Sequence, residues 1–355
     1  MTLRKRRIIF AVSSLLFFII APALLLYSQG YRIDSHFRVS KTGGLYISSP
    51  VPGSEIFVQN HLKKTTNFLQ TGLFIQDLPE GNYQILVNKN DYWPWLKTLN
   101  VKESLVAEAR AFLIPKNPEG KVLLRGQFNA VWASPYNRVL LLEEKKGNNR
   151  KITFYLPDTN TFLIPASSTT TKLLSFKNEF SKISWDNNAV ILEENKNKNV
   201  IRASFDFNSG TVSALPESFN AISASVNDKY EKFAYQKKER LFWDDKNNSI
   251  WLEWLGDKNA IPYYICDNRP CDSTNYLIAT FPSSPIKNVD FFPGRRDIII
   301  IAIQNKVFAL EIDGRGGRVS QPIYKGKDPV FAAFPDEKKV YILDDGILYV
   351  VNLTA

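Results

Sequence analysis

The chain has 355 residues, of which 46 are aromatic, 45 are Lys or Arg and 35 are Asp or Glu, so its net charge is +10. Hydrophobic residues make up 44% and charged residues 23%, which excludes a disordered chain and allows two or three domains. Two histidines and two cysteines leave little material for a zinc centre, an iron–sulfur cluster or a histidine-based triad. We therefore assign no catalytic, metal-binding or cofactor-binding residue and expect no cofactor.

The N-terminus predicts a single membrane-spanning helix. A cationic cluster opens the chain: Arg4, Lys5, Arg6 and Arg7. An apolar run of 20 residues, 8–27, follows and would span about 30 Å as a helix, the thickness of the hydrocarbon core of a bilayer. Because cationic flanks stay in the cytoplasm, residues 1–27 are expected to form a cytoplasmic tail and anchor, with the bulk of the chain outside the cytoplasm.

A cleaved signal peptide is the alternative interpretation of the same segment. Ala21-Pro22-Ala23 is a small-residue triplet of the kind that precedes a cleavage site. Three leucines and Tyr27 follow it, and a mature chain would rarely begin with them, which favours an uncleaved anchor. Under both interpretations the remaining chain is exported, so a nucleic-acid partner is not expected.

The net charge divides between the anchor and the exported part. No acidic residue precedes Tyr27, so the cationic cluster accounts for +4. The remaining chain carries 41 basic and 35 acidic residues, a net charge of +6. This mild excess is typical of a soluble surface domain, although it also suits anionic cell-surface polymers.

Residues 28–42 are polar and are predicted to form a stalk, and residues 43–115 are predicted to form a small antiparallel β-sandwich. Six short strands with turn clusters between them fit into this segment. The turns contain Pro50, Pro52 and Gly53, and later Pro79 and Gly81.

Two motifs in the segment carry a family resemblance. Residues 49–54 read S-P-V-P-G-S, and residues 78–87 read L-P-E-G-N-Y-Q-I-L-V, with Asn90-Asp91-Tyr92 where Gly-Tyr is typical. The segment resembles the PEGA domain, a bacterial extracytoplasmic β-module, over about a fifth of the chain. The resemblance implies a β-sandwich at a bacterial surface and, for the whole chain, a PEGA-domain protein of the bacterial plasma membrane.

An aromatic cluster near the end of this segment has two interpretations. Tyr92, Trp93 and Trp95 lie beside Lys89 and Lys97, and flat rings with cations suit the faces of sugars. The cluster is therefore a candidate ligand contact. The preferred alternative is that these rings pack inside the sandwich, against the membrane or against the next domain.

After a linker at 116–120, residues 121–355 are predicted to form a β-propeller of about five to six blades. The string Leu-Glu-Glu occurs at 142–144 and again at 192–194, each time after a Trp-containing strand and before three further strand and turn signals. Similar openings begin near residues 221, 286 and 330, and a sixth unit is considered between 258 and 284. Four-stranded units of 40 to 50 residues bury both faces by stacking around an axis.

The ends of the repeat region predict how the ring closes. The last unit has strand signals near Val330, Val340 and Ile347 and lacks a fourth. Residues 121–125 form a lone strand before the first unit. We expect this strand to complete the last blade and to remove its exposed edge. The chain as a whole is thus predicted to be all-β apart from its anchor.

Cys266 and Cys271 are predicted to form a disulfide. The chain is expected to be exported, where thiols oxidise, and the two residues enclose a four-residue loop. A redox-active pair would need a closer Cys-x-x-Cys motif and a helix, and neither is present.

The remaining candidates for chemistry are acids in turns and two histidines. Propeller hydrolases pair carboxylates at the axial end, but turn acids are also simply turn formers. The acids considered are Asp244, Asp245, Asp336, Asp344 and Asp345. Neither His36 nor His61 has a ligand or base partner at a suitable spacing, and no metal role is expected.

The sequence favours a binding or scaffold protein of the bacterial envelope rather than an enzyme. Its partner is expected to be an envelope protein or a cell-wall polymer, recognised through the loops of the propeller. The alternatives are an envelope glycan hydrolase, with carboxylates at the axis of the propeller, and an envelope sensor.

Overall fold

A computed structural model describes most of the chain as two compact units. Unit 1 comprises residues 1–90, 94–113 and 315–317, and unit 2 comprises 91–93, 114–314 and 318–355. The described residues are 3–33, 39–147, 149–195, 199–217, 231–233, 238–244, 247–266, 271 and 273–353.

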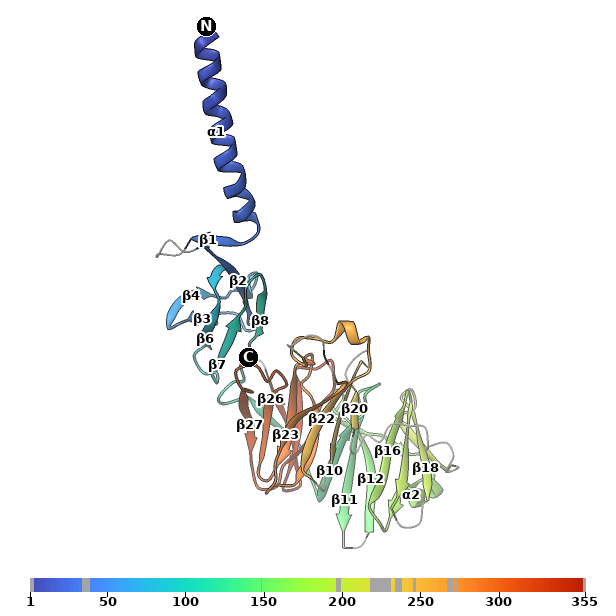
Figure 1. The fold of residues 1–355 in the computed structure, drawn as a ribbon. Helices are drawn as coiled ribbons and strands as arrows, with labels where there is room; N and C mark the ends of the chain where they lie inside the picture. The colour runs from blue at the N-terminus through green and yellow to red at the C-terminus, as the bar shows by residue number, and fades with distance from the viewer. Residues whose placement is uncertain are drawn as a thin grey trace. The chain divides into compact units, whose positions relative to one another are not determined.

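Unit 1 begins with the long helix α1 (Leu3–Ser28). The segment Lys5–Ser28 has a mean hydropathy of 2.7 and none of it is buried, so it has the length and composition of a membrane anchor or signal sequence. Pro22 lies inside the helix. The helix leads directly into β1 (Figure 1).

Two four-stranded sheets follow in unit 1 (Figure 1). The strands of the first are β1 (Tyr31–Ile33), β2 (Val39–Ser48), β5 (Gly72–Pro79) and β8 (Val106–Arg110). The strands of the second, in spatial order, are β4 (His61–Thr65), β3 (Glu55–Val58), β6 (Gly81–Asn88) and β7 (Trp95–Val101). Alternate residues such as Leu45, Ile47, Ile85 and Val87 are fully buried, as expected for strands with one face on a core.

The structure corrects two expectations for this part of the chain. The segment 28–42 is not a plain stalk, because β1 pairs with the beginning of β2, with Tyr31 opposite Lys41. The sandwich is also not purely antiparallel, because β8 runs parallel to β2. The local sequence of these strands does not show which other strand each of them pairs with.

The described residues of unit 2 form five successive sheets, which we number as blades 1 to 5. Blade 1 consists of β10 (Phe128–Ala133), β11 (Leu140–Lys146), β12 (Asn149–Leu156), β13 (Thr161–Phe162) and β15 (Ser175–Phe176). Blade 2 consists of β16 (Phe180–Asp186), β17 (Ala189–Glu194), β18 (Val200–Asp206), β19 (Thr211–Pro216) and β14 (Ile164–Pro165), and the short helix α2 (Ser168–Leu173) lies between β14 and β15 in the chain. Blade 3 consists of β20 (Glu231–Phe233), β21 (Glu239–Asp244), β22 (Ser249–Trp254) and β23 (Asn275–Thr280). Blade 4 consists of β24 (Ile286–Phe291), β25 (Ile298–Ile303), β26 (Lys306–Glu311) and β27 (Ser320–Lys325).

Blade 5 closes the propeller in the predicted way. It consists of β28 (Val330–Ala332), β29 (Lys339–Asp344), β30 (Ile347–Asn352) and β9 (Gly120–Arg125). Strand β9 pairs antiparallel with β30, so Leu124 lies opposite Leu348 and Val122 opposite Tyr349. The first strand of the repeat region therefore supplies the missing fourth strand of the last blade, which confirms the prediction.

Apolar side chains fill the space between neighbouring blades. One buried cluster joins blades 1 and 2 and includes Phe154 and Phe205, whose ring centroids lie 5.0 Å apart. A second joins blades 3 and 4, and a third joins blades 1 and 5 through residues such as Leu140 and Phe334. At these three interfaces one sheet covers the face of the next, as in the propeller architecture.

The extra blade considered between 258 and 284 is not present among the described residues. The described residues of this segment form the short 3₁₀ helix η3 (Lys258–Ala260) and β23, and β23 is the outermost strand of blade 3. The opening near residue 221 lies outside the described residues. Blade 3 carries a long insertion between its last two strands, which is why the repeat spacing stretches there.

Candidate functional site

The first strands of several blades line a cavity of about 110 Å³ in unit 2. In a propeller the first strand of each blade is the innermost, so this cavity lies along the axis. Its walls are formed by Ala130–Ala133 of β10, Lys232 of β20, Trp243 of β21, Lys287, Asn288 and Asp290 of β24, and Val330–Ala332 of β28.

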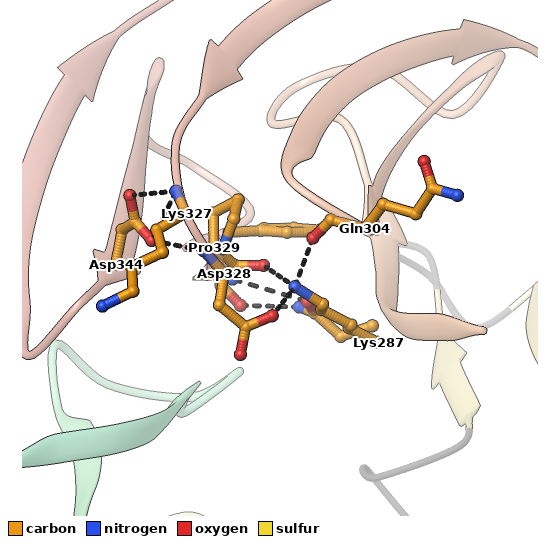
Figure 2. Close-up of polar contacts among 8 residues, drawn as sticks. Lys287, Gln304, Lys327, Asp328, Pro329 and Asp344 are labelled. Carbon is orange, nitrogen blue, oxygen red and sulfur yellow. Dashed lines mark hydrogen bonds and ion pairs between the residues drawn. The ribbon is translucent and has the colours of Figure 1, made fainter. Parts of the chain in front are cut away.

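The polar side chains at the axis are engaged with groups on neighbouring blades. Lys232 Nζ lies 3.9 Å from Asp290 Oδ2, which links blade 3 to blade 4. The Asn288 amide donates to the carbonyl oxygen of Phe331 at 2.6 Å, and Lys287 forms an ion pair with Asp328 (Figure 2). These contacts hold the innermost strands together.

Asp344 holds the loop that carries Asp328 (Figure 2). Its carboxylate accepts hydrogen bonds from the backbone N–H groups of Lys327 and Asp328, at 3.0 and 2.7 Å, and from the hydroxyl of Tyr324 at 3.0 Å. Burial opposes ionisation of this carboxyl, but the hydrogen bonds outweigh it and lower the pKa of Asp344. A Cβ on Gly326 would lie 1.9 Å from Asp344 Oδ2, so this approach requires glycine.

The turns between the first and second strands of the blades are joined to one another. We call residues 134–139, 187–188, 292–297 and 333–338, from blades 1, 2, 4 and 5, the turn ring. The Asn137 amide donates to the carbonyl oxygen of Asn187 at 2.8 Å, joining blades 1 and 2. The backbone N–H of Gly294 donates to the carbonyl oxygen of Pro335 at 3.0 Å, joining blades 4 and 5.

Two arginines add further connections between the blades. Arg138 of blade 1 forms ion pairs with Asp336 and Glu337 of blade 5, and the Glu337 carboxylate also accepts a hydrogen bond from the Tyr341 hydroxyl at 2.9 Å. Burial raises the pKa of Tyr341 to about 12, so its hydroxyl remains a donor at neutral pH. Arg296 of blade 4 reaches Glu239 of blade 3 at 3.3 Å.

The turn ring also presents an exposed aromatic side chain. Tyr136 is 49% exposed and lies two residues before Arg138. Its neighbour Asn137 is fixed by its bond to blade 2. Tyrosine and arginine are the residue types that contribute most binding energy at protein interfaces. Tyr136 is thus a large exposed side chain on a part of the surface that is held by contacts between blades.

Sequence reasoning missed this site, although a signal for it was present. Pro135 precedes Arg138 by three residues, and Pro293 precedes Arg296 by the same interval. Each arginine then contacts an acid on the preceding blade of the ring. The repeated Pro-x-x-Arg spacing therefore marked the inter-blade contacts.

The structure separates the three predicted aromatic contacts. Tyr92 and Trp95 are buried, at 4% and 0% exposure, and only Trp93 of the three is partly open, at 36%. Tyr92 forms a β-bridge with Pro115, and the Lys116 ammonium lies 5.9 Å from the centroid of the Trp93 ring. The three rings therefore form no shared sugar-binding face, and packing accounts for two of them.

The predicted disulfide is present. Cys266 and Cys271 are bonded, with their Cα atoms 6.2 Å apart. The bridge lies within the insertion between β22 and β23 of blade 3. No cysteine among the described residues is left as a free thiol.

The turn carboxylates do not converge in the described part of the chain. Asp336 pairs with Arg138, Asp345 with Lys327, and Asp344 caps its own loop. Every described carboxyl with a shifted pKa, namely Asp186, Glu194, Asp206 and Asp344, is shifted downwards. These groups are ionised at neutral pH and act as hydrogen-bond acceptors.

The structure assigns no role to His61 or to the described part of the basic N-terminus. His61 is exposed at the start of β4, and His36 and Asp245 lie outside the described residues. Among the described residues, no group of three or more His, Cys, Asp or Glu side chains is placed to hold a metal ion. Arg4, Lys5, Arg6 and Arg7 belong to the first turns of α1.

No protein-family model and no curated protein sequence match this chain. Solved structures with a similar fold include a luciferin-regenerating enzyme, at 10% identity and a TM-score of 0.41, covering 66% of this chain and 95% of that one. TolB from Acinetobacter baumannii has 12% identity and a TM-score of 0.30, covering 76% of this chain and 59% of that one. A chain of a nidogen–laminin complex has 9% identity and a TM-score of 0.30, covering 75% and 82%. At these scores the likenesses carry no argument about function.

Proposed function

We propose that this protein is a membrane-anchored binding or scaffold protein of the bacterial envelope. In this proposal α1 spans the plasma membrane, the cationic cluster Arg4 to Arg7 stays in the cytoplasm, and both β-units lie outside it. The sandwich is a PEGA-like module, as its turn motifs suggest. The propeller recognises an envelope protein or a cell-wall polymer.

The observation that carries the proposal is the turn ring. Its backbone is tied from blade to blade through Asn137, Gly294 and Arg138, so little conformational entropy is lost when a partner binds. It presents Tyr136, a rigid amphipathic side chain with few rotatable bonds. A rigid, aromatic and cationic surface supports recognition of a macromolecule.

The axial cavity speaks against glycan hydrolysis, the alternative function. A glycosidase needs two carboxyl groups on either side of the scissile bond, one of them with a raised pKa. Among the described residues that line the cavity, Asp290 is the single carboxylate, and it faces Lys232. The volume of about 110 Å³ holds several water molecules but no sugar chain.

Site-specific photocrosslinking in intact cells tests the proposal. A photoreactive phenylalanine analogue replaces Tyr136 in the turn ring, and the matched control replaces Phe162, which is 42% exposed on an outer strand of the same blade. We expect a discrete adduct with an envelope protein or wall polymer from position 136 and none from position 162. The proposal is wrong if neither position gives an adduct and purified wall polymers also fail to retain the full-length protein.

A further inference from the structure

The end of the membrane helix is hydrogen-bonded to the β-sandwich. Only Gln29 separates Ser28, the last residue of α1, from Gly30. The carbonyl oxygen of Gly30 accepts hydrogen bonds from both the backbone N–H and the hydroxyl of Thr42, each at 3.0 Å. Thr42 belongs to β2, which is a central strand of the first sheet. The helix is therefore joined to the sandwich without a spacer.

Arg32 adds a second connection between the helix and the sheet. Its guanidinium donates to the carbonyl oxygen of Tyr27 at 2.8 Å and lies over the Tyr27 ring at 3.7 Å. The same guanidinium forms an ion pair with Asp77 of β5 at 2.8 Å. The Arg32 side chain thus contacts both the last turn of α1 and strand β5 of the sheet.

The loop between β7 and β8 lies at this same end of the sandwich. The backbone N–H of Ser104 donates to the carbonyl oxygen of Thr42 at 3.0 Å, and Gly44 donates to that of Leu105 at 2.9 Å. A Cβ on Gly43 would lie 2.3 Å from the Lys102 carbonyl oxygen, so glycine is needed for this close approach. We call residues 30–32, 41–43 and 102–106 the sandwich base.

The length of the connection fixes where the base can lie. Two residues span at most about 7 Å, so the Gly30–Thr42 contact lies within that distance of the end of α1. The headgroup layer on each side of a bilayer is roughly 5 to 8 Å thick. If the apolar run spans the hydrocarbon core, the base therefore lies in or against the headgroup layer, whatever the tilt of the helix.

The side chains of the base suit a headgroup layer. Tyr27 lies in the last turn of α1 and Tyr31 opens β1 three residues after the helix, both at the position of the interfacial aromatic belt. The Lys41 ammonium lies 5.3 Å from the centroid of the Tyr31 ring. Leu105 and Val106 are 58% and 54% exposed although they are large and apolar. Among the described residues at this end the charges are balanced: Arg32, Lys41 and Lys102 against Asp77, Glu80 and Glu103.

We propose that the sandwich base is a membrane-contact surface that sits in the lipid headgroup layer around α1, with Leu105 and Val106 inserted at the boundary with the acyl chains. The proposal rests on the proposed transmembrane anchoring of α1. Its function is to hold the sandwich upright at a fixed height above the bilayer. Because the charges are balanced, the contact needs no anionic lipid and persists at high salt.

Single-cysteine labelling tests the proposal in the full-length protein. The native cysteines are joined in a disulfide, so an introduced cysteine supplies the reactive thiol. The test variant is L105C, and the matched control is L69C, an exposed leucine beyond Gly72 at the other end of β5. Six strand residues separate the two ends of this sheet, so position 69 lies about 20 Å farther along the sandwich.

Each variant is labelled with an environment-sensitive fluorophore and reconstituted into phosphatidylcholine vesicles that contain a headgroup nitroxide lipid. Because the headgroup layer is only roughly 5 to 8 Å thick, we expect about threefold or stronger quenching at position 105 than at position 69. Equally weak quenching at both positions overturns the proposal, and equally strong quenching also overturns it because the sandwich would then lie flat. Flotation of the protein with the vesicles reports anchoring separately, so loss of the anchor is distinguished from loss of the base contact.

Discussion

The ion pairs of Arg138 join the first blade to the last, so their removal tests how the propeller ring is held closed. Replacing Arg138 with Met keeps most of the aliphatic length of the side chain and removes its charge. The Glu337 carboxylate, whose side chain is 7% exposed, then keeps the Tyr341 hydroxyl as a hydrogen-bond donor but loses its cation. The partly exposed Asp336 loses its ion pair as well.

The expected loss follows from how deeply each partner is buried. Leaving a buried charged acceptor without its partner costs about 1 to 3 kcal/mol, and the 37% exposure of the Arg138 side chain places this case near the middle of that range. The pair with Asp336, which is 71% exposed, adds less than about 1 kcal/mol. We expect the free energy of unfolding to fall by about 2 kcal/mol and the melting temperature by roughly 4 to 8 °C.

Thermal unfolding of the full-length protein in detergent, followed by tryptophan fluorescence, measures this loss. The matched control is R202M, because Arg202 is 36% exposed but its partner Asp186 is 53% exposed, and its loss should cost less than about 1 kcal/mol. The double variant R138M/E337Q removes the uncompensated charge and should recover part of the stability. The reasoning is refuted if R138M destabilises the protein no more than R202M does, or if E337Q gives no recovery.

Three further predictions concern other parts of the chain. G43A should lower the melting temperature and expose the sandwich to proteolysis, because its Cβ would lie 2.3 Å from the Lys102 carbonyl oxygen. G44A should cost much less, because its Cβ would lie 3.1 Å from the Phe74 ring and 3.3 Å from the Ile75 carbonyl oxygen; equal protease resistance of the two variants would contradict this. The pKa of Asp344 is lowered in the folded protein. The stability contributed by its ionised carboxylate is therefore complete above the ordinary pKa of 3.8 and is lost as the pH falls through the lower folded value. An asparagine side chain at this position cannot ionise, so acid unfolding of D344N should lack this pH-dependent loss. Replacing both cysteines of the disulfide with serine should reduce the free energy of unfolding by about 2 kcal/mol, measured by urea denaturation of oxidised protein, and a change near zero would argue against the loop-entropy account.

Some features of this protein were determined by the sequence itself because their causes are local. The alternation of buried side chains marked most strands, and Asp345-Gly346 marked the tight turn between β29 and β30, where both residues have positive φ. The apolar run of α1 and the short Cys266–Cys271 interval are equally local. The pairing of β9 with β30 was predictable because the last repeat unit lacked a fourth strand, and the strand at 121–125 belonged to no repeat unit.

Only the tertiary structure decided the features that depend on distant partners. The pairing of β1 with β2 and the bonds between Gly30 and Thr42 turned a predicted stalk into a direct junction between helix and sandwich. Burial separated Trp93 from Tyr92 and Trp95, although the three lie within four residues. The turn ring likewise exists because Arg138 meets an acid some 200 residues later. Strand pairing and ion pairing across a ring depend on which surfaces the closed fold brings together, and local sequence patterns do not contain that information.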